Sequence, residues 1–82
     1  MTAINKNKLR FHCRRGMGEL EDILYPFFDE KFDLLSHEQQ QNFSKLIECE
    51  DIELWDWLVT KVKTSPEQHR AIVELINQHA TA

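Results

Sequence analysis

The spacing of the apolar residues most constrains the fold of this chain, because it is helical from end to end. Between residues 18 and 32, six apolar side chains fall three and four positions apart: Leu20, Ile23, Leu24, Phe27, Phe28 and Phe32. That spacing gathers them on one stripe of an α-helix. The alternation of apolar and polar residues that is typical of strands is missing from the sequence. The pattern therefore predicts an all-α fold.

Two glycines separate the first two predicted helices. The first helix is expected over residues 7–15, with Gly16 as its natural stop. The second is expected from Gly18 to Phe32, and it contains Pro26 in its interior.

Three further helices are predicted from their start signals. Ser36 and Gln39 form the pattern of a capping box, and Asp51 is a good cap for a fourth helix. The run Ser65–Gln68 combines a cap, a proline in the first turn and a second capping box. The residues expected to face the core of these three helices are Phe43, Leu46, Ile47, Leu54, Trp55, Leu58, Val59, Val62, Ile72, Val73 and Ile76.

The length of 82 residues is enough for one domain. Because the predicted connections are short, we expect a single compact five-helix bundle over residues 1–82, with about five N-terminal and three C-terminal residues frayed. So small a chain has little room for an enclosed catalytic cavity beside its core. We therefore expect a protein that is not an enzyme.

The cysteines and the hydropathy indicate the compartment, and the spacing of the cysteines and histidines indicates whether a metal is bound. Cys13 and Cys49 are the only cysteines, and the N-terminal residues lack the continuous apolar segment of a secretion signal. Both thiols are therefore expected to be free and reduced. The histidines and cysteines lack ligand spacing, so no metal is expected, and the histidines after residue 36 are expected at the surface. The sequence has no run of 18 apolar residues, so we expect a cytoplasmic protein without a membrane span.

The charge is distributed unevenly along the chain. The net charge is −4, yet every acidic residue lies at Glu19 or later. Half of the basic residues fall in ten positions: Lys6, Lys8, Arg10, Arg14 and Arg15. The basic segment either docks on the acidic body or forms an exposed patch for an anionic partner. The acidic body would repel nucleic acid, so no nucleic-acid partner is expected.

The two glycines stand in the segment RRGMGE, which has two interpretations. In the structural one, Gly16 ends a helix in a left-handed conformation, and the flanking charges suit the two helix dipoles. In the functional one, Gly16 and Gly18 leave the backbone bare for the approach of another surface. Arg15 is then a planar donor for an interface, with Glu19 four residues on to orient its guanidinium. The residues alone leave both interpretations open.

The same segment carries a resemblance to a known family. RGMGE, from Arg15 to Glu19, matches the RGxxE motif of the succinate dehydrogenase assembly factor family. Together with YPFFDEKFDLLSHEQ and FSKLIECEDIELWDWL, it makes the chain resemble that family over nearly its whole length. The resemblance implies a helical, chaperone-like factor and not a catalyst. Such a factor binds the flavoprotein subunit of succinate dehydrogenase, and in bacteria that of fumarate reductase.

The resemblance also implies the role of FAD and the residues of the site. The factor promotes covalent attachment of FAD to a histidine of the flavoprotein subunit, so FAD belongs to the partner and this chain binds no cofactor of its own. The motif carries over onto Arg15, Gly16 and Glu19. Arg15 and Glu19 are expected to project outward and grip the partner.

Three further residues complete the expected partner-binding set. Arg14 precedes the motif, and Gly18 occupies its second free position. Trp57 lies off the apolar stripe of its helix, so it belongs either to the core or to an interface. The chain is expected to act as a monomer. The alternative function is a small binding module that acts on nucleic acid or on a toxin, like an antitoxin, through its basic N-terminal helix.

Overall fold

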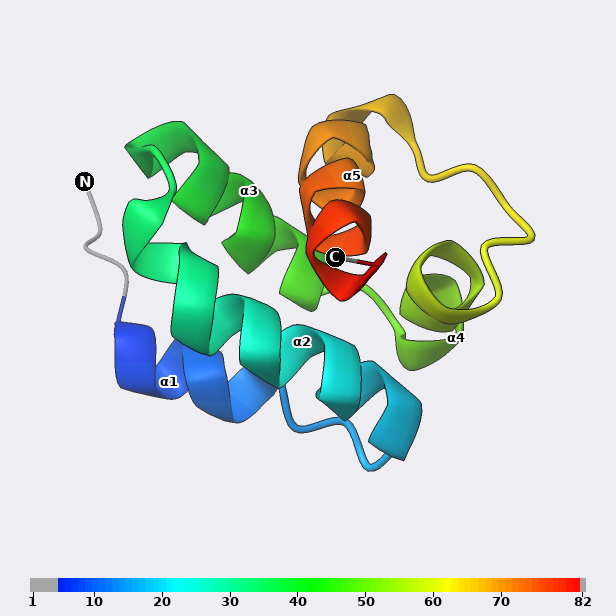
Figure 1. Cartoon of the computed structure of the whole chain (residues 1–82), viewed down its shortest axis with the longest axis horizontal. Helices are drawn as coiled ribbons and strands as arrows, with labels where there is room; N and C mark the ends of the chain where they lie inside the picture. The colour runs from blue at the N-terminus through cyan, green and yellow to red at the C-terminus, as the bar shows by residue number, and fades with distance from the viewer. Residues whose placement is uncertain (1–4, 82) are drawn as a thin grey trace.

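The structure, a computed structural model, describes residues 5–81 and contains five α-helices within that range (Figure 1). A 3-10 turn, η1, continues the second helix, and a π-helical turn, η2, continues the fourth. The bounds are α1 (Lys6–His12), α2 (Gly18–Lys31), η1 (Phe32–Leu34), α3 (His37–Ile47), α4 (Asp51–Leu54), η2 (Trp55–Val59) and α5 (Glu67–Thr81). No strand occurs in residues 5–81. The predicted all-α bundle of five helices is confirmed.

The helix boundaries follow local hydrogen bonds. The predicted capping box is present: Ser36 accepts a hydrogen bond from the Gln39 amide, and the Gln39 side chain accepts one from the Ser36 amide. The expected cap Asp51 is instead the first residue of α4, because Glu50 and Glu53 form the capping box there. Helix α1 ends at His12 and not at residue 15 as expected.

The sequence predicts frayed residues at both ends of the chain. Residues 1–4 and 82 lie outside the residues that the structure describes, so the prediction is not tested there. Asn5 instead caps α1, because its side chain accepts a hydrogen bond of 3.1 Å from the Lys8 amide. Helix α5 extends to Thr81, two residues beyond the expected limit at His79.

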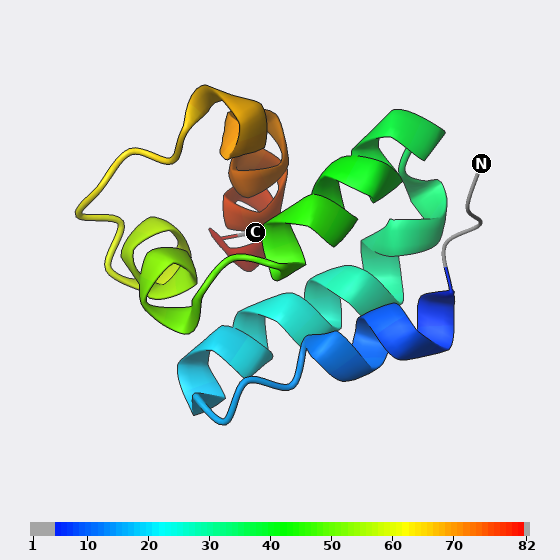
Figure 2. The same ribbon diagram turned by 180° about the vertical axis from the view of Figure 1, so that it is seen from behind.

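The core is built around α5 and an aromatic cluster. Helix α5 packs against α2, α3 and η2, as the two opposite views show (Figures 1 and 2). Phe43 of α3 lies at the centre of the cluster, with ring centroids 5.7 Å from Phe27, 5.9 Å from Phe28 and 5.8 Å from Phe32. Such pairs stabilise a core beyond the area that they bury. The cluster fixes the C-terminal half of α2 on α3.

Ion pairs hold the basic helix α1 on the acidic body. Lys6 lies 2.6 Å from Asp33, and Arg10 makes two hydrogen bonds to Asp29, at 2.7 and 2.9 Å. The Arg10 guanidinium also lies 4.7 Å from the centroid of the Tyr25 ring. The hydrogen bond from Arg10 keeps the pKa of Asp29 below its ordinary value. Of the two interpretations of the basic segment, the structure supports docking for Lys6 and Arg10.

The π-helical turn η2 closes the helix that α4 begins, and Val62 lies beyond it. The Thr60 amide bonds to the Trp55 carbonyl five residues back, so the turn is wider than that of an α-helix. Trp57 is buried with Leu54, three residues earlier on the same face, and is 7% exposed. Lys61, with a φ of 56°, follows the end of the helix, and Val62 is 70% exposed. The expectation that Val62 faces the core is therefore wrong, because the helix ends before it.

We predict that stability distinguishes these two positions. Trp57→Ala removes a buried aromatic side chain and should lower the free energy of unfolding by about 3–5 kcal/mol. Val62→Ala should change it by less than about 0.5 kcal/mol. Urea unfolding followed by circular dichroism measures both. A larger loss for Val62→Ala than for Trp57→Ala would contradict the buried position of Trp57 and the exposed position of Val62.

Candidate functional site

The loop between α1 and α2, residues 13–17, carries the first three residues of the motif, and Gly18 and Glu19 begin α2 (Figure 1). Gly16 has a φ of 74°, the expected left-handed conformation. A Cβ atom at Gly16 would meet nothing within 4 Å, so the backbone conformation and not a lack of space requires glycine there. Gly18 is the first residue of α2 and has no positive φ. Both glycines are exposed.

The carboxylate of Glu21, in the first turn of α2, accepts hydrogen bonds from the backbone of this loop. One oxygen of its carboxylate, Oε2, accepts hydrogen bonds from two successive amides: that of Arg15 at 3.0 Å and that of Gly16 at 2.7 Å. Hydrogen bonds to an ionised acceptor are shorter and stronger than neutral ones. The turn of the loop is therefore tied to the first residues of α2.

The Arg15 side chain turns inward and bonds to the end of α3. Its guanidinium donates to the carbonyls of Ile47 and of Cys49, the latter at 3.4 Å, and to Asp51 Oδ1 at 3.2 Å. The last carbonyls of a helix lack partners within that helix and carry partial negative charge. Arg15 therefore bonds the end of α3 to the loop, and its side chain is only 15% exposed.

The expected arrangement of the motif is partly corrected. Glu19 and Arg14 are exposed, as expected. Arg15 does not project outward, because its own chain supplies the acceptors. Asp51 and not Glu19 pairs with the guanidinium. Trp57 lies in the core, so of its two interpretations the structure supports packing.

Sequence reasoning missed the role of Glu21 and the pairing of Asp51. The sequence pattern gave Asp51 only the role of a helix cap. A carboxylate in the first turns of a helix that follows a bare loop is the signal for Glu21, since it can reach back to the amides of the loop. The sequence holds no comparable signal for Asp51, which lies 36 residues from Arg15.

The cysteines are free, as expected. Burial raises the pKa of Cys13 to about 11 and also raises the pKa of Cys49. The expectation that His69 lies at the surface is wrong: it is 8% exposed, with its Nε2 3.4 Å from Cys49 Sγ. Its ring packs 5.8 Å from that of Trp57, which explains the burial. Within residues 5–81, no three histidine, cysteine or acidic side chains are grouped to hold a metal ion.

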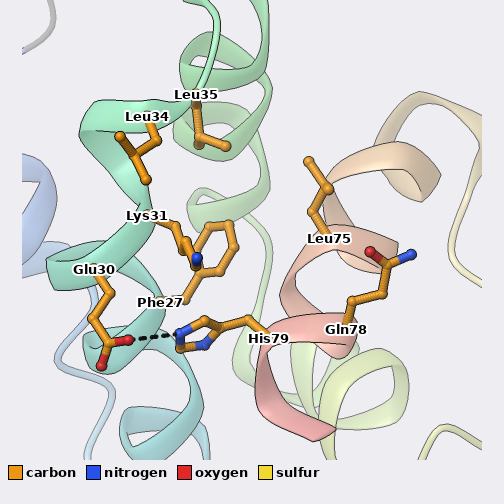
Figure 3. Close-up of a pocket in the computed structure, with 8 residues that line it drawn as sticks. All are labelled: Phe27, Glu30, Lys31, Leu34, Leu35, Leu75, Gln78 and His79. Carbon is orange, nitrogen blue, oxygen red and sulfur yellow. Dashed lines mark hydrogen bonds and ion pairs between the residues drawn. The ribbon is translucent and has the colours of Figure 1, made fainter. Parts of the chain in front are cut away.

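A pocket of about 680 Å³ lies away from the loop, between the C-terminal part of α2 with η1 and the end of α5 (Figure 3). It is lined by Phe27, Glu30, Lys31, Leu34, Leu35, Leu75, Gln78 and His79. His79 is only partly exposed, contrary to expectation, because its ring edge packs on Phe27 and its Nε2 lies 3.2 Å from Glu30. The lining shows no nucleophile beside a base, so the pocket suggests no reaction.

In the described part of the chain, no helix is both long enough and apolar enough to span a bilayer.

Comparisons with known proteins agree on one family. The family described as "Flavinator of succinate dehydrogenase" matches residues 7–80. A protein of Vibrio vulnificus named FAD assembly factor SdhE is 38% identical over 78 residues, which cover 95% of this chain and 91% of that protein. The protein of the same name from Yersinia pseudotuberculosis is 36% identical over 82 residues, covering 100% of this chain and 93% of the relative.

We predict that the two arginines of the motif differ in their effect on stability. Arg15→Ala leaves the carbonyls at the end of α3 without their donor and should cost about 1.5–3 kcal/mol of unfolding free energy. Arg14→Ala, at the exposed neighbour, should cost less than about 0.5 kcal/mol. Urea unfolding measures both, and equal effects would show that Arg15 is not bound as described.

The two glycines should also differ. Gly16→Ala forces a side chain into a left-handed conformation and should destabilise the chain by roughly 1–2 kcal/mol. Gly18→Ala reduces the freedom of the unfolded chain at a helical position and should stabilise it by about 0.4–1 kcal/mol. Thermal unfolding measures both changes. A stabilising Gly16→Ala would contradict the left-handed turn.

Proposed function

This chain belongs to the family of flavinators of succinate dehydrogenase, and we propose from this that it is an FAD assembly factor. It binds the flavoprotein subunit of succinate dehydrogenase and promotes covalent attachment of FAD to that subunit. FAD and the histidine that receives it belong to the partner. The chain acts as a non-catalytic binding protein.

The main support for this site is the exposed turn at Gly16. Its backbone has no side chain to cover it, and the hydrogen bonds of the Arg15 and Gly16 amides to the Glu21 carboxylate hold it in one conformation. Arg14 and Glu19 stand exposed on either side, one of each charge. A bare backbone flanked by opposite charges allows close approach and sets the orientation of a partner. We assign the direct contacts to Arg14, Gly16 and Glu19.

Three other residues of the expected set have indirect roles in this proposal. Arg15 acts by holding the loop against the α3–α4 junction, since its guanidinium is already bonded there. Gly18 keeps the first turn of α2 free of a side chain next to Glu19. Trp57 supports α4 and η2 from within the core.

The chemistry of flavin attachment suggests how a binding protein can help. Formation of the bond between flavin and histidine requires the two groups to be held in a reactive geometry, with the charge that develops on the flavin stabilised. A protein that binds the conformation in which the flavin site is ordered shifts the partner towards it. The Gly16 turn would contact the partner at its flavin-side surface.

The proposal also covers the flavoprotein subunit of fumarate reductase, and it takes the chain to be a monomer in the cytoplasm. The two free cysteines suit a reducing compartment. The antitoxin-like alternative through α1 is less well supported, because acids of the same chain already pair with Lys6 and Arg10.

The test is covalent flavin on the partner. Each flavoprotein subunit is coexpressed with the wild-type chain, with Glu19→Ala or with the control Glu74→Ala, an exposed acid of α5. Flavin fluorescence in a denaturing gel should fall about tenfold or more with Glu19→Ala, as for the loss of a strong interface contact. Glu74→Ala should match the wild type.

One result would contradict the proposed site. If Glu19→Ala unfolds at the wild-type temperature and still supports wild-type flavin attachment, Glu19 is not a partner contact. If the wild-type chain itself does not raise covalent flavin on either subunit, the proposed function fails.

A further inference from the structure

Glu21 lies outside the motif, yet its carboxylate binds the turn formed by Arg15 and Gly16, the first two residues of the motif. Two successive N–H groups that converge on one oxygen form a concavity that binds an anion. Here the anion is a carboxylate of the same chain, at 3.0 Å from the Arg15 amide and 2.7 Å from the Gly16 amide. Resting on the proposed function, we propose that Glu21 is a positioning residue that fixes the loop in the conformation that the flavoprotein subunit binds.

The helical backbone that carries the carboxylate is ordered. Glu21 is half-buried, and its own amide bonds to the Met17 carbonyl at 3.1 Å in the first turn of α2. Gly16, by contrast, has no side chain to restrict it, and nothing lies within 4 Å of its Cβ position. The Gly16 amide is bonded to Glu21, and the Arg15 guanidinium holds only the preceding residue. Without the two bonds to Glu21, the backbone at Gly16 would sample other conformations.

Fixing this turn also directs the neighbouring side chains. The Arg15 amide is held by Glu21 while its guanidinium is held at the α3–α4 junction, so this residue is fixed at both ends. Arg14 is then left on the outer side of the loop. Because affinity falls with the fraction of molecules in the binding conformation, loss of Glu21 should raise the dissociation constant about tenfold if that fraction falls to about a tenth.

Three variants separate positioning from direct contact. Glu21→Ala removes the acceptor. Glu21→Gln keeps an acceptor oxygen at the same reach but removes the charge. Asp22→Ala removes the exposed neighbouring acid and serves as the matched control.

The first measurement uses the chain alone. Amide hydrogen exchange by NMR should show protected Arg15 and Gly16 amides in the wild type and in Asp22→Ala. In Glu21→Ala both amides should exchange at least about tenfold faster, while amides of α3 and α5 are unchanged. Glu21→Gln should be intermediate. Unprotected amides in the wild type would overturn the positioning role, whatever binding shows.

The second measurement is affinity for the flavoprotein subunit by titration calorimetry. We expect Glu21→Ala to bind about tenfold more weakly, Glu21→Gln within about threefold of the wild type, and Asp22→Ala like the wild type. Equal losses in the Ala and Gln variants, with the Gln amides still protected, would show that Glu21 contacts the partner through its charge, which overturns positioning. Fast exchange with unchanged affinity would overturn it as well.

The two proposals fail in different ways. If the wild-type chain does not bind the subunit, the proposed function fails, and the exchange data still decide whether Glu21 holds the loop. If the wild type binds but the Glu21 variants behave like Asp22→Ala, only the positioning role fails. Should Glu21→Ala not fold, Glu21→Gln carries both comparisons.

Discussion

The bonds from Arg15 to the end of α3 are the interaction on which the rest of the site depends. They join two segments more than thirty residues apart in the sequence. The carbonyls of Ile47 and Cys49 need donors at the end of a helix, and the guanidinium supplies several in one plane. A lysine could not serve them in the same way, since it presents a single charged point. The loop is thereby bound to the body of the bundle.

This arrangement divides the charged residues of the segment into two groups. Arg15, Glu21 and Asp51 face the chain itself and fix the backbone. Arg14 and Glu19 face outward and can meet another protein. A surface fixed before binding loses less conformational entropy when a partner arrives. The segment thus joins residues that fix the backbone to exposed residues to which we assign the binding of the partner.

The sequence predicted the fold well because helix spacing and capping are local. The five helices and the Ser36 capping box depend on neighbours three and four residues apart. The end of the helix at the π-helical turn was not predictable, so the prediction that Val62 faces the core is wrong. In the site, the left-handed Gly16 was foreseen. The inward Arg15 was not, because its acceptors are mostly backbone carbonyls, which leave no mark in a sequence.

The most direct test of the inward Arg15 is NMR of the two arginine guanidinium groups in a single ¹⁵N-labelled sample. Arg14 provides the comparison within the same molecule. The account predicts separate, slowly exchanging Nη signals for Arg15, with contacts to Ile47 and Cys49, and one averaged signal for Arg14. Averaged signals for both arginines would show that Arg15 is free in solution, and the account would be contradicted.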